Sequence, residues 1–126
     1  MGKLMCSIRE CMSDLRSEND NILSANFIFP DDFLGFEGHF PGKPVLPGVC
    51  KIQAVLLMLR ESKNKNVLLK EIVQAKFFSP VLCNEEITFN LEEKPELRED
   101  ISVKAMVTGK DKKIAEMHLR VSVIEG

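Results

Sequence analysis

Residues 36–49 read FEGHFPGKPVLPGV, a stretch that sets one histidine among three glycines and three prolines. Proline fixes φ near about −65° and lacks a backbone N–H, whereas glycine allows close backbone approach, so the stretch predicts a rigid, sharply turning loop. An apolar helical run follows directly. A stiff loop that holds His39 beside a helix start can position an imidazole and a ring of backbone amides. That combination suits acid–base chemistry on a carbonyl compound.

The apolar run that follows the loop predicts a helix over residues 49–63. Ile52, Val55, Leu56 and Leu59 recur at i, i+3, i+4 and i+7, the spacing of one helix face. The apolar surface is widened almost all round by three more side chains: Val49, Leu57 and Met58. An apolar surface on nearly every side is typical of a helix that is enclosed by other elements of the fold.

The second half of the chain alternates between apolar and polar residues. This period of two predicts strands over residues 86–92, 101–108 and 115–123, each with one apolar face and one polar face. Residues 67–78 predict a further long strand with mixed faces. Antiparallel strands with one apolar face need something apolar to cover, and the enclosed helix supplies it.

The first third of the chain is less regular. Residues 22–29 have the composition of a strand, and residues 17–21 predict the turn before it. Residues 31–34, which follow Pro30, predict a short turn of helix. Residues 1–16 are ambiguous, because apolar side chains fall at helical spacing next to a segment that predicts a hairpin.

Size and charge limit the classes of function. The 126 residues predict a single domain over residues 1–126. A net charge of −2 and a pI near 5.7 argue against nucleic acid or an anionic membrane surface as the main partner. No apolar run approaches the roughly 20 residues of a membrane span, and no secretory signal is readable, so we expect a cytoplasmic protein.

The four cysteines form no C-x-x-C pair and have no companion histidine at zinc-ligand spacing. We therefore expect four reduced thiols, mostly buried, and no zinc site. Cys50 is set apart by its place in the first turn of the predicted helix, where the pKa of a thiol can fall. A Cys50–His39 nucleophilic pair is a minor alternative, because the sequence supplies no third group to orient it.

The pattern GHFPGxPVxPGV over residues 38–49 resembles the signature of the hotdog-fold 3-hydroxyacyl-acyl-carrier-protein dehydratases of fatty acid synthesis. Weaker matches are AKF at residues 75–77 with PV at 80–81, and the segment 111–117, so that the resemblance spans roughly residues 8–124. It implies an α+β hotdog fold, in which a curled antiparallel sheet wraps one long central helix. It also implies dimers or higher oligomers whose active sites use groups from both subunits of a dimer.

The resemblance assigns roles to residues of the loop and the helix start. It implies that His39 removes the proton next to the thioester carbonyl of a 3-hydroxyacyl substrate, carried on acyl carrier protein or CoA, to give the trans-2-enoyl thioester. It implies that the amide of Gly48 binds the carbonyl oxygen, that the carbonyl of Val45 orients the imidazole, and that Val49 lies at the substrate. No metal or organic cofactor is implied.

Elementary chemistry agrees with these roles. Histidine is the side chain whose unperturbed pKa lies near neutrality, as a base for a carbon-bound proton requires. A helix N-terminus presents unpaired amides and a partial positive charge to an enolate-like oxygen. The second histidine, His118, lies on the polar face of a predicted strand between Glu116 and Arg120, so we expect it to be exposed to solvent.

The chain departs from the family pattern at Gln53. Fourteen residues after the histidine, the family carries a Glu or Asp that protonates the departing hydroxyl. An amide can donate a hydrogen bond but has no proton to give, and general acid–base assistance is typically worth about 10²–10⁴ in rate.

Three interpretations of Gln53 stay open. In the first, the protein is a dehydratase in which Gln53 contacts the 3-hydroxyl and water or another carboxylate, such as Glu37, supplies the proton. In the second, it is a catalytically impaired subunit that pairs with a complete homologous subunit. In the third, it is a hotdog acyl thioesterase or acyl-binding protein in which Gln53 orients a water. A basic group could also dock an acidic carrier protein: Lys43, Lys51, Arg60, Lys63 and Lys65.

Overall fold

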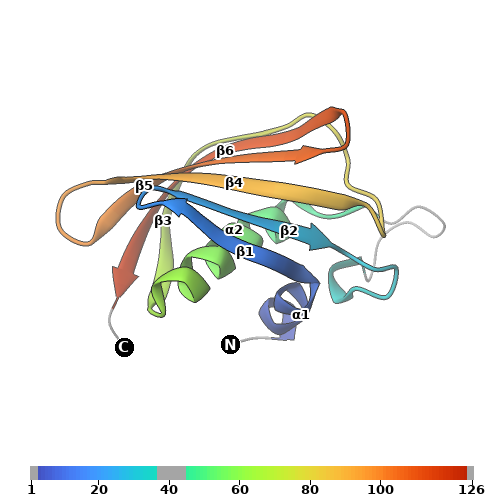
Figure 1. Ribbon diagram of the computed structural model, residues 1–126, viewed down its shortest axis with the longest axis horizontal. Helices are drawn as coiled ribbons and strands as arrows, with labels where there is room; N and C mark the ends of the chain where they lie inside the picture. The colour runs from blue at the N-terminus through green and yellow to red at the C-terminus, as the bar shows by residue number, and fades with distance from the viewer. Residues whose placement is uncertain (1–2, 37–44, 125–126) are drawn as a thin grey trace.

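The protein, seen in a computed structural model, is described over residues 3–36 and 45–124. In chain order the elements are α1 (Lys3–Cys11), β1 (Met12–Asn19), β2 (Ile22–Ile28), the 3₁₀ turn η1 (Leu34–Phe36), α2 (Gly48–Lys63), β3 (Asn66–Phe77), β4 (Glu86–Pro95), β5 (Asp100–Gly109) and β6 (Lys112–Ile124). The strands form one antiparallel sheet in the order β1-β2-β4-β5-β6-β3 (Figure 1).

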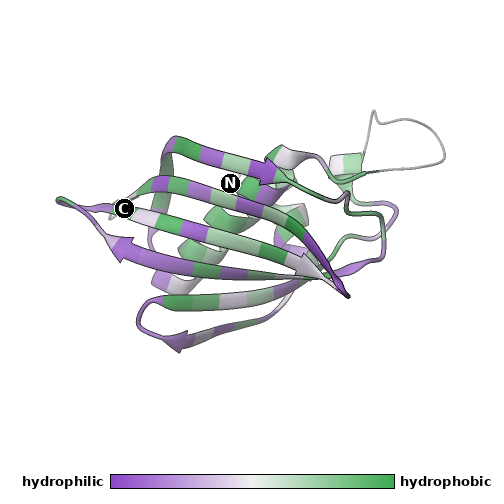
Figure 2. Cartoon of the chain, turned by 90° about the horizontal axis from the view of Figure 1, so that it is seen from above, coloured by the Kyte–Doolittle hydropathy of each residue, from purple (hydrophilic) through white to green (hydrophobic). Residues whose placement is uncertain are grey.

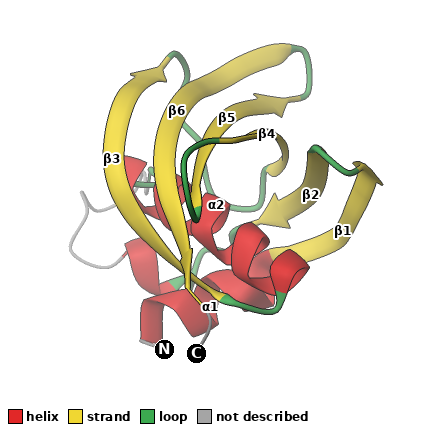
Figure 3. Cartoon of the chain, turned by 90° about the vertical axis from the view of Figure 1, so that its left-hand side faces the viewer, coloured by secondary structure: helices red, strands yellow, loops and turns green. Residues whose placement is uncertain are grey.

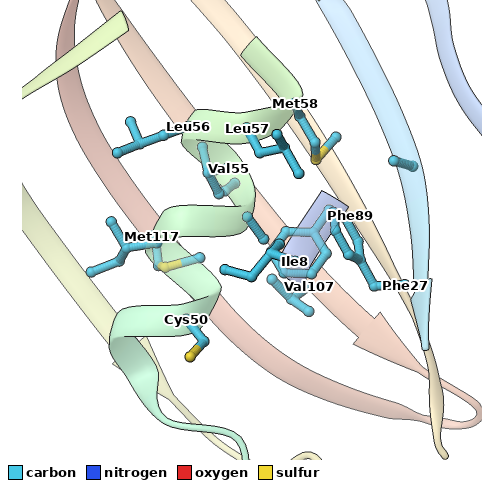
Figure 4. Close-up of a cluster of buried hydrophobic side chains, with 14 of the residues drawn as sticks. Ile8, Phe27, Cys50, Val55, Leu56, Leu57, Met58, Phe89, Val107 and Met117 are labelled. Atoms are coloured by element: carbon cyan, nitrogen blue, oxygen red, sulfur yellow. The ribbon is translucent and has the colours of Figure 1, made fainter. Parts of the chain in front are cut away.

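The sheet curls around α2, with β1 and β3 at its two edges (Figure 3). The central helix is buried on almost every side, as the sequence predicts. Its side chains meet apolar residues from the concave face of the sheet and from α1, including Ile8, Phe27, Phe89, Val107 and Met117 (Figure 4). This α+β architecture is the expected hotdog fold, and the apolar helix is the core that holds the sheet in its curl.

Alternation along the strands decides which face turns inward. In β4, Ile87, Phe89 and Leu91 are buried, whereas Thr88 and Asn90 between them are partly exposed. Figure 2 shows hydrophobic and hydrophilic residues alternating along the strands. Phe89 pairs with Val107 of β5, which is buried on the same face. A shift of the register by one residue would turn this apolar set to solvent, so the burial pattern fixes the pairing.

The start of the chain resolves the ambiguity of residues 1–16. It forms α1, which buries Met5 and Ile8, and then passes at once into β1. The predicted turn at 17–21 is shorter than expected, because β1 continues to Asn19. The Oδ1 atom of Asn19 accepts hydrogen bonds from the backbone N–H groups of Asn21 and Ile22, at 2.8 and 3.1 Å.

The short turn predicted at 31–34 is present but not as an α-helix, and a 3₁₀ turn follows it. A first turn closes with the hydrogen bond from Phe33 N to Pro30 O, and η1 follows with the bond from Phe36 N to Phe33 O. Phe33 and Phe36 are both buried, and their rings meet edge to face at 5.5 Å.

Strand β3 pairs only with β6 among the described strands and forms an edge of the sheet. This edge strand carries large apolar side chains that are about half exposed, on both of its faces: Leu68, Ile72, Val73 and Phe77. The prediction of mixed faces for this strand is therefore confirmed. No helix in the described ranges is long and apolar enough to cross a membrane.

Candidate active site

The first turn of α2 is the centre of the candidate site. The helix begins at Gly48, one residue before the predicted start, with Pro47 in an extended conformation as its N-cap. Pro47 makes no side-chain cap, and the first turn contains no acidic residue. The N–H groups of a first turn have no partner within the helix and carry its partial positive charge. Gly48 and the exposed Val49 lie in this first turn, and their predicted role in carbonyl binding stays a prediction.

The chain on both sides of residues 37–44 is anchored near this turn. Before that segment, Gly35 packs so closely on Cys50 that a β-carbon added to it would lie 2.9 Å from Sγ. After it, the N–H of Leu46 donates to the carbonyl of Val81 at 2.9 Å, and Val45 forms an isolated bridge with Leu82. His39, Glu37 and Lys43 lie outside the described residues. Their predicted roles therefore stay predictions.

Gln53 lies on the second turn of α2 and is partly buried. Its side chain forms no hydrogen bond with the described part of the chain. Toward the described residues, its donors and its acceptor therefore remain available to a ligand or a water.

Lys51 is the unexpected residue of this region, because it is only 3% exposed. Its Nζ donates to the carbonyl oxygen of Leu46 at 3.3 Å and lies 5.0 Å from the centroid of the Phe77 ring. Burial lowers the pKa of the Lys51 ammonium from its ordinary value of 10.5. The expectation that Lys51 belongs to an exposed docking surface is wrong, because the helix start and β3 cover it.

The same aromatic ring covers Gly48. A β-carbon on Gly48 would lie 3.0 Å from Cζ and 3.2 Å from Cε2 of Phe77. The absence of a side chain at Gly48 therefore lets the last residue of β3 lie against the helix start. Sequence reasoning missed this contact, although Phe77 belongs to the AKF match at residues 75–77.

Cys50 does not have the environment of a reactive thiol. It is 1% exposed, and burial raises the pKa of its thiol from 9.0, an effect that the nearby Lys51 charge only partly offsets. The alternative in which Cys50 is a nucleophile with a lowered pKa is contradicted by this burial. All four cysteines are free, but only Cys50 is fully buried and Cys6 is exposed, so the expectation of mostly buried thiols is wrong.

His118 lies on the outer face of the sheet, as predicted, but it is only partly exposed. Its Nε2 lies 2.6 Å from the hydroxyl oxygen of Ser102 on the neighbouring strand β5. It borders a cavity of about 580 Å³ over the outer face of the sheet. A second cavity, of about 780 Å³, lies at the other end of α2 beside Lys63. His118 therefore lies on the face of the sheet opposite to α2.

Two other basic residues of the proposed docking group, Arg60 and Lys63, are engaged within the protein. The guanidinium of Arg60 donates to the carbonyl oxygen of Val67 at 2.7 Å. Lys63 pairs with Glu93 at 2.6 Å. The expected basic surface is thus interrupted by internal contacts, and its member Lys51 is buried.

A known protein family matches most of the chain. The family described as ApeI-like, ApeI dehydratase, matches residues 15–117. The chain belongs to the ApeI-like dehydratase family. The match covers β1 to the middle of β6 and includes the helix start with all its neighbours.

Curated relatives agree with this family. The chain is 30% identical over 99 residues to the 3-hydroxyacyl-(acyl-carrier-protein) dehydratase FabZ of Caulobacter sp. strain K31. That alignment covers 71% of this chain and 61% of the relative. The chain therefore spans less than two thirds of the length of this relative.

Solved structures share the fold at low identity. The dehydratase heterocomplex ApeI:P from Xenorhabdus doucetiae superposes with a TM-score of 0.72 at 16% identity, covering 88% of this chain and 96% of that one. A hypothetical thioesterase protein with coenzyme A from Streptococcus pneumoniae TIGR4 gives a TM-score of 0.66 at 10% identity, covering 89% and 88%. At these identities the likeness establishes the hotdog fold alone.

Proposed function

We propose that the protein acts on 3-hydroxyacyl thioesters, bound to acyl carrier protein or CoA, and removes water to give the trans-2-enoyl thioester. Membership of the ApeI-like dehydratase family carries this proposal. The thioester carbonyl would bind over the first turn of α2, against the amide of Gly48 and beside Val49, with no metal or organic cofactor. We place the reaction in the cytoplasm, in a chain that acts as one domain.

The chemistry needs a base for the proton next to the carbonyl and donors for the charge that develops on its oxygen. His39 is the proposed base, with the carbonyl of Val45 as its orienting acceptor. Hydrogen-bond donors that are already positioned where negative charge develops usually make the largest contribution to stabilising the transition state. The first turn of α2 offers such donors, and its lack of an acidic residue leaves their field unopposed.

Gln53 is the proposed contact of the 3-hydroxyl. Its amide can donate a hydrogen bond to the leaving oxygen, while a water completes the proton transfer. We therefore expect slow turnover, because the amide gives orientation without general acid catalysis.

A second candidate function is hydrolysis of the thioester. The amide of Gln53 favours it, since it has no hydrogen-bond partner among the described residues and a side chain with both donors and an acceptor can hold an attacking water. The Streptococcus neighbour, named as a hypothetical thioesterase, has the same fold. In this alternative His39 activates the water, and the product is a free thiol.

We propose that the working unit is at least a dimer, formed through the β3 edge with a second copy or a homologous subunit. An edge strand presents unpaired backbone groups, and this one adds half-exposed Leu68, Ile72 and Val73. The Xenorhabdus neighbour is a heterocomplex of dehydratases, which supports a homologous partner as the alternative.

One assay separates these functions. The protein is incubated with 3-hydroxyacyl thioesters of CoA and of acyl carrier protein, and ultraviolet absorbance of the conjugated enoyl thioester is followed beside release of free thiol. Enoyl formation supports the dehydratase, and thiol release supports the thioesterase. Enoyl formation only after addition of a homologous subunit would identify an impaired partner. Absence of every one of these signals would refute the proposed function.

A further inference from the structure

Lys51 occupies a position that disfavours a cation in three ways. It is almost fully buried, and removal of an ammonium from water is costly unless an anion compensates it. It lies in the first turn of α2, at the positive end of the helix, where a positive charge is unfavourable. Among the described residues no carboxylate pairs with it; its contacts are the Leu46 carbonyl and the Phe77 ring.

These contacts hold the ammonium in one place. The hydrogen bond to Leu46 ties Nζ to the residue just before the N-cap Pro47. The cation–π contact ties it to the ring of Phe77, whose atoms also pack against Gly48. The positive charge and the first residue of the helix thus lie against the same aromatic ring.

We propose that Lys51 provides a fixed positive charge that strengthens the hold of the α2 start on the thioester carbonyl oxygen as negative charge develops there. This inference rests on the proposed binding of the carbonyl over Gly48. Lys51 acts through its charge, without touching the substrate, and so is not a catalytic residue. Its charge adds to the partial charge of the helix end, in a setting that water screens poorly. The buried charge lowers the stability of the folded state, and proteins commonly keep such a destabilising residue where activity requires it.

The test compares Lys51→Met with the wild-type protein in the assay for enoyl formation. We expect kcat to fall about tenfold, while KM changes less than about threefold. This decrease in kcat is smaller than the one that follows removal of a hydrogen-bond donor in direct contact with the oxyanion. Thermal stability should be unchanged or higher, because the substitution removes a buried charge. A purely structural lysine would instead lower stability and leave kcat intact.

Two further variants isolate the charge. Lys51→Gln removes the charge and keeps a hydrogen-bond donor, so it should lose as much kcat as Lys51→Met. Lys63→Met makes the same replacement at the far end of α2, where Lys63 pairs with Glu93, and should leave kcat unchanged. Wild-type kcat in either Lys51 variant would overturn the inference.

A readout without turnover separates this inference from the proposed reaction. Isotope-edited infrared spectroscopy of a thioester labelled with ¹³C at the carbonyl reports polarisation of that bond in the bound state. We expect the stretching frequency to fall on binding to the wild type and to fall less with Lys51→Met. Equal shifts, or no shift with the wild type, would overturn the role of Lys51. A shift without enoyl formation would overturn only the dehydratase reaction.

Discussion

The ring of Phe77 lies against Gly48, at a distance that leaves 3.0 Å between its Cζ and a β-carbon added to the glycine. This contact joins the end of β3 to the start of α2, two segments separated by a full helix and strand. It also brings an apolar residue of the proposed dimer edge next to the proposed carbonyl-binding amide. The proposed site and the proposed interface would therefore share the side chain of Phe77.

The first prediction concerns this contact. Gly48→Ala should destabilise the protein by about 1 kcal/mol when Phe77 is present, because the new methyl group displaces the ring. In a Phe77→Ala background the same change should be neutral or stabilising, since alanine favours helix over glycine. Urea unfolding of the four proteins in a double-mutant cycle measures the coupling. Additive effects would show that the two residues do not compete for space.

The second prediction concerns Gln53. Gln53→Glu should raise the rate of dehydration at least tenfold, within the range typical of proton transfer by a positioned acid. The measurement is kcat for enoyl formation, with Gln53→Met as the matched control of similar size that restores no acid. A rate that stays at the wild-type level would indicate a site rebuilt for another reaction.

The third prediction concerns the β3 edge. Ile72→Lys puts a charge among the half-exposed apolar residues of this strand and should convert the dimer to a monomer. Ser13→Lys, on the opposite edge strand β1, should leave the molar mass unchanged. Light scattering coupled to size exclusion gives the molar mass of each variant. A wild-type protein that is monomeric at every concentration would remove the proposed interface.

The fourth prediction concerns Cys11. Burial raises the pKa of its thiol from 9.0 to about 11, with a further contribution from the negative charges of Glu10 and Asp32. Between these two values the unfolded chain loses the proton first, so the folded state loses stability as pH rises above 9.0. Below that range the thiol is protonated in both states and has no such effect. The free energy of unfolding should thus fall less steeply over this range in Cys11→Ala.

The thiols offer a fifth prediction. Alkylation of the native protein near neutral pH, followed by intact mass, should modify the exposed Cys6 first. Cys50 should react only after unfolding, because burial both covers it and raises the pKa of its thiol. Rapid native labelling of Cys50 would restore it as a candidate nucleophile.

The fold could be predicted because its signals are local. Alternation in residues 86–123 and the apolar periodicity from Ile52 to Leu59 fixed the strands and the enclosed helix. Residues 1–16 could not be assigned, because α1 buries only Met5 and Ile8 and the edge strand β1 has no fully buried residue. Such weak patterns do not separate a short helix from a strand.

The candidate site could be predicted in part. The motif over residues 38–49 located the helix start and singled out Gly48 and Gln53. The burial of Lys51 could not be predicted, because a lysine within a helical pattern ordinarily indicates a charge exposed to solvent. Only the fold brings Phe77, from the far end of a later strand, over its ammonium.

The most direct test of the central claim is the rate of enoyl thioester formation from a 3-hydroxyacyl thioester by the wild type and by His39→Ala. The account predicts measurable dehydration by the wild type and loss of it in the variant, at equal folded stability. Full activity in His39→Ala would contradict the account, because the imidazole would then have no part in removing the proton beside the carbonyl.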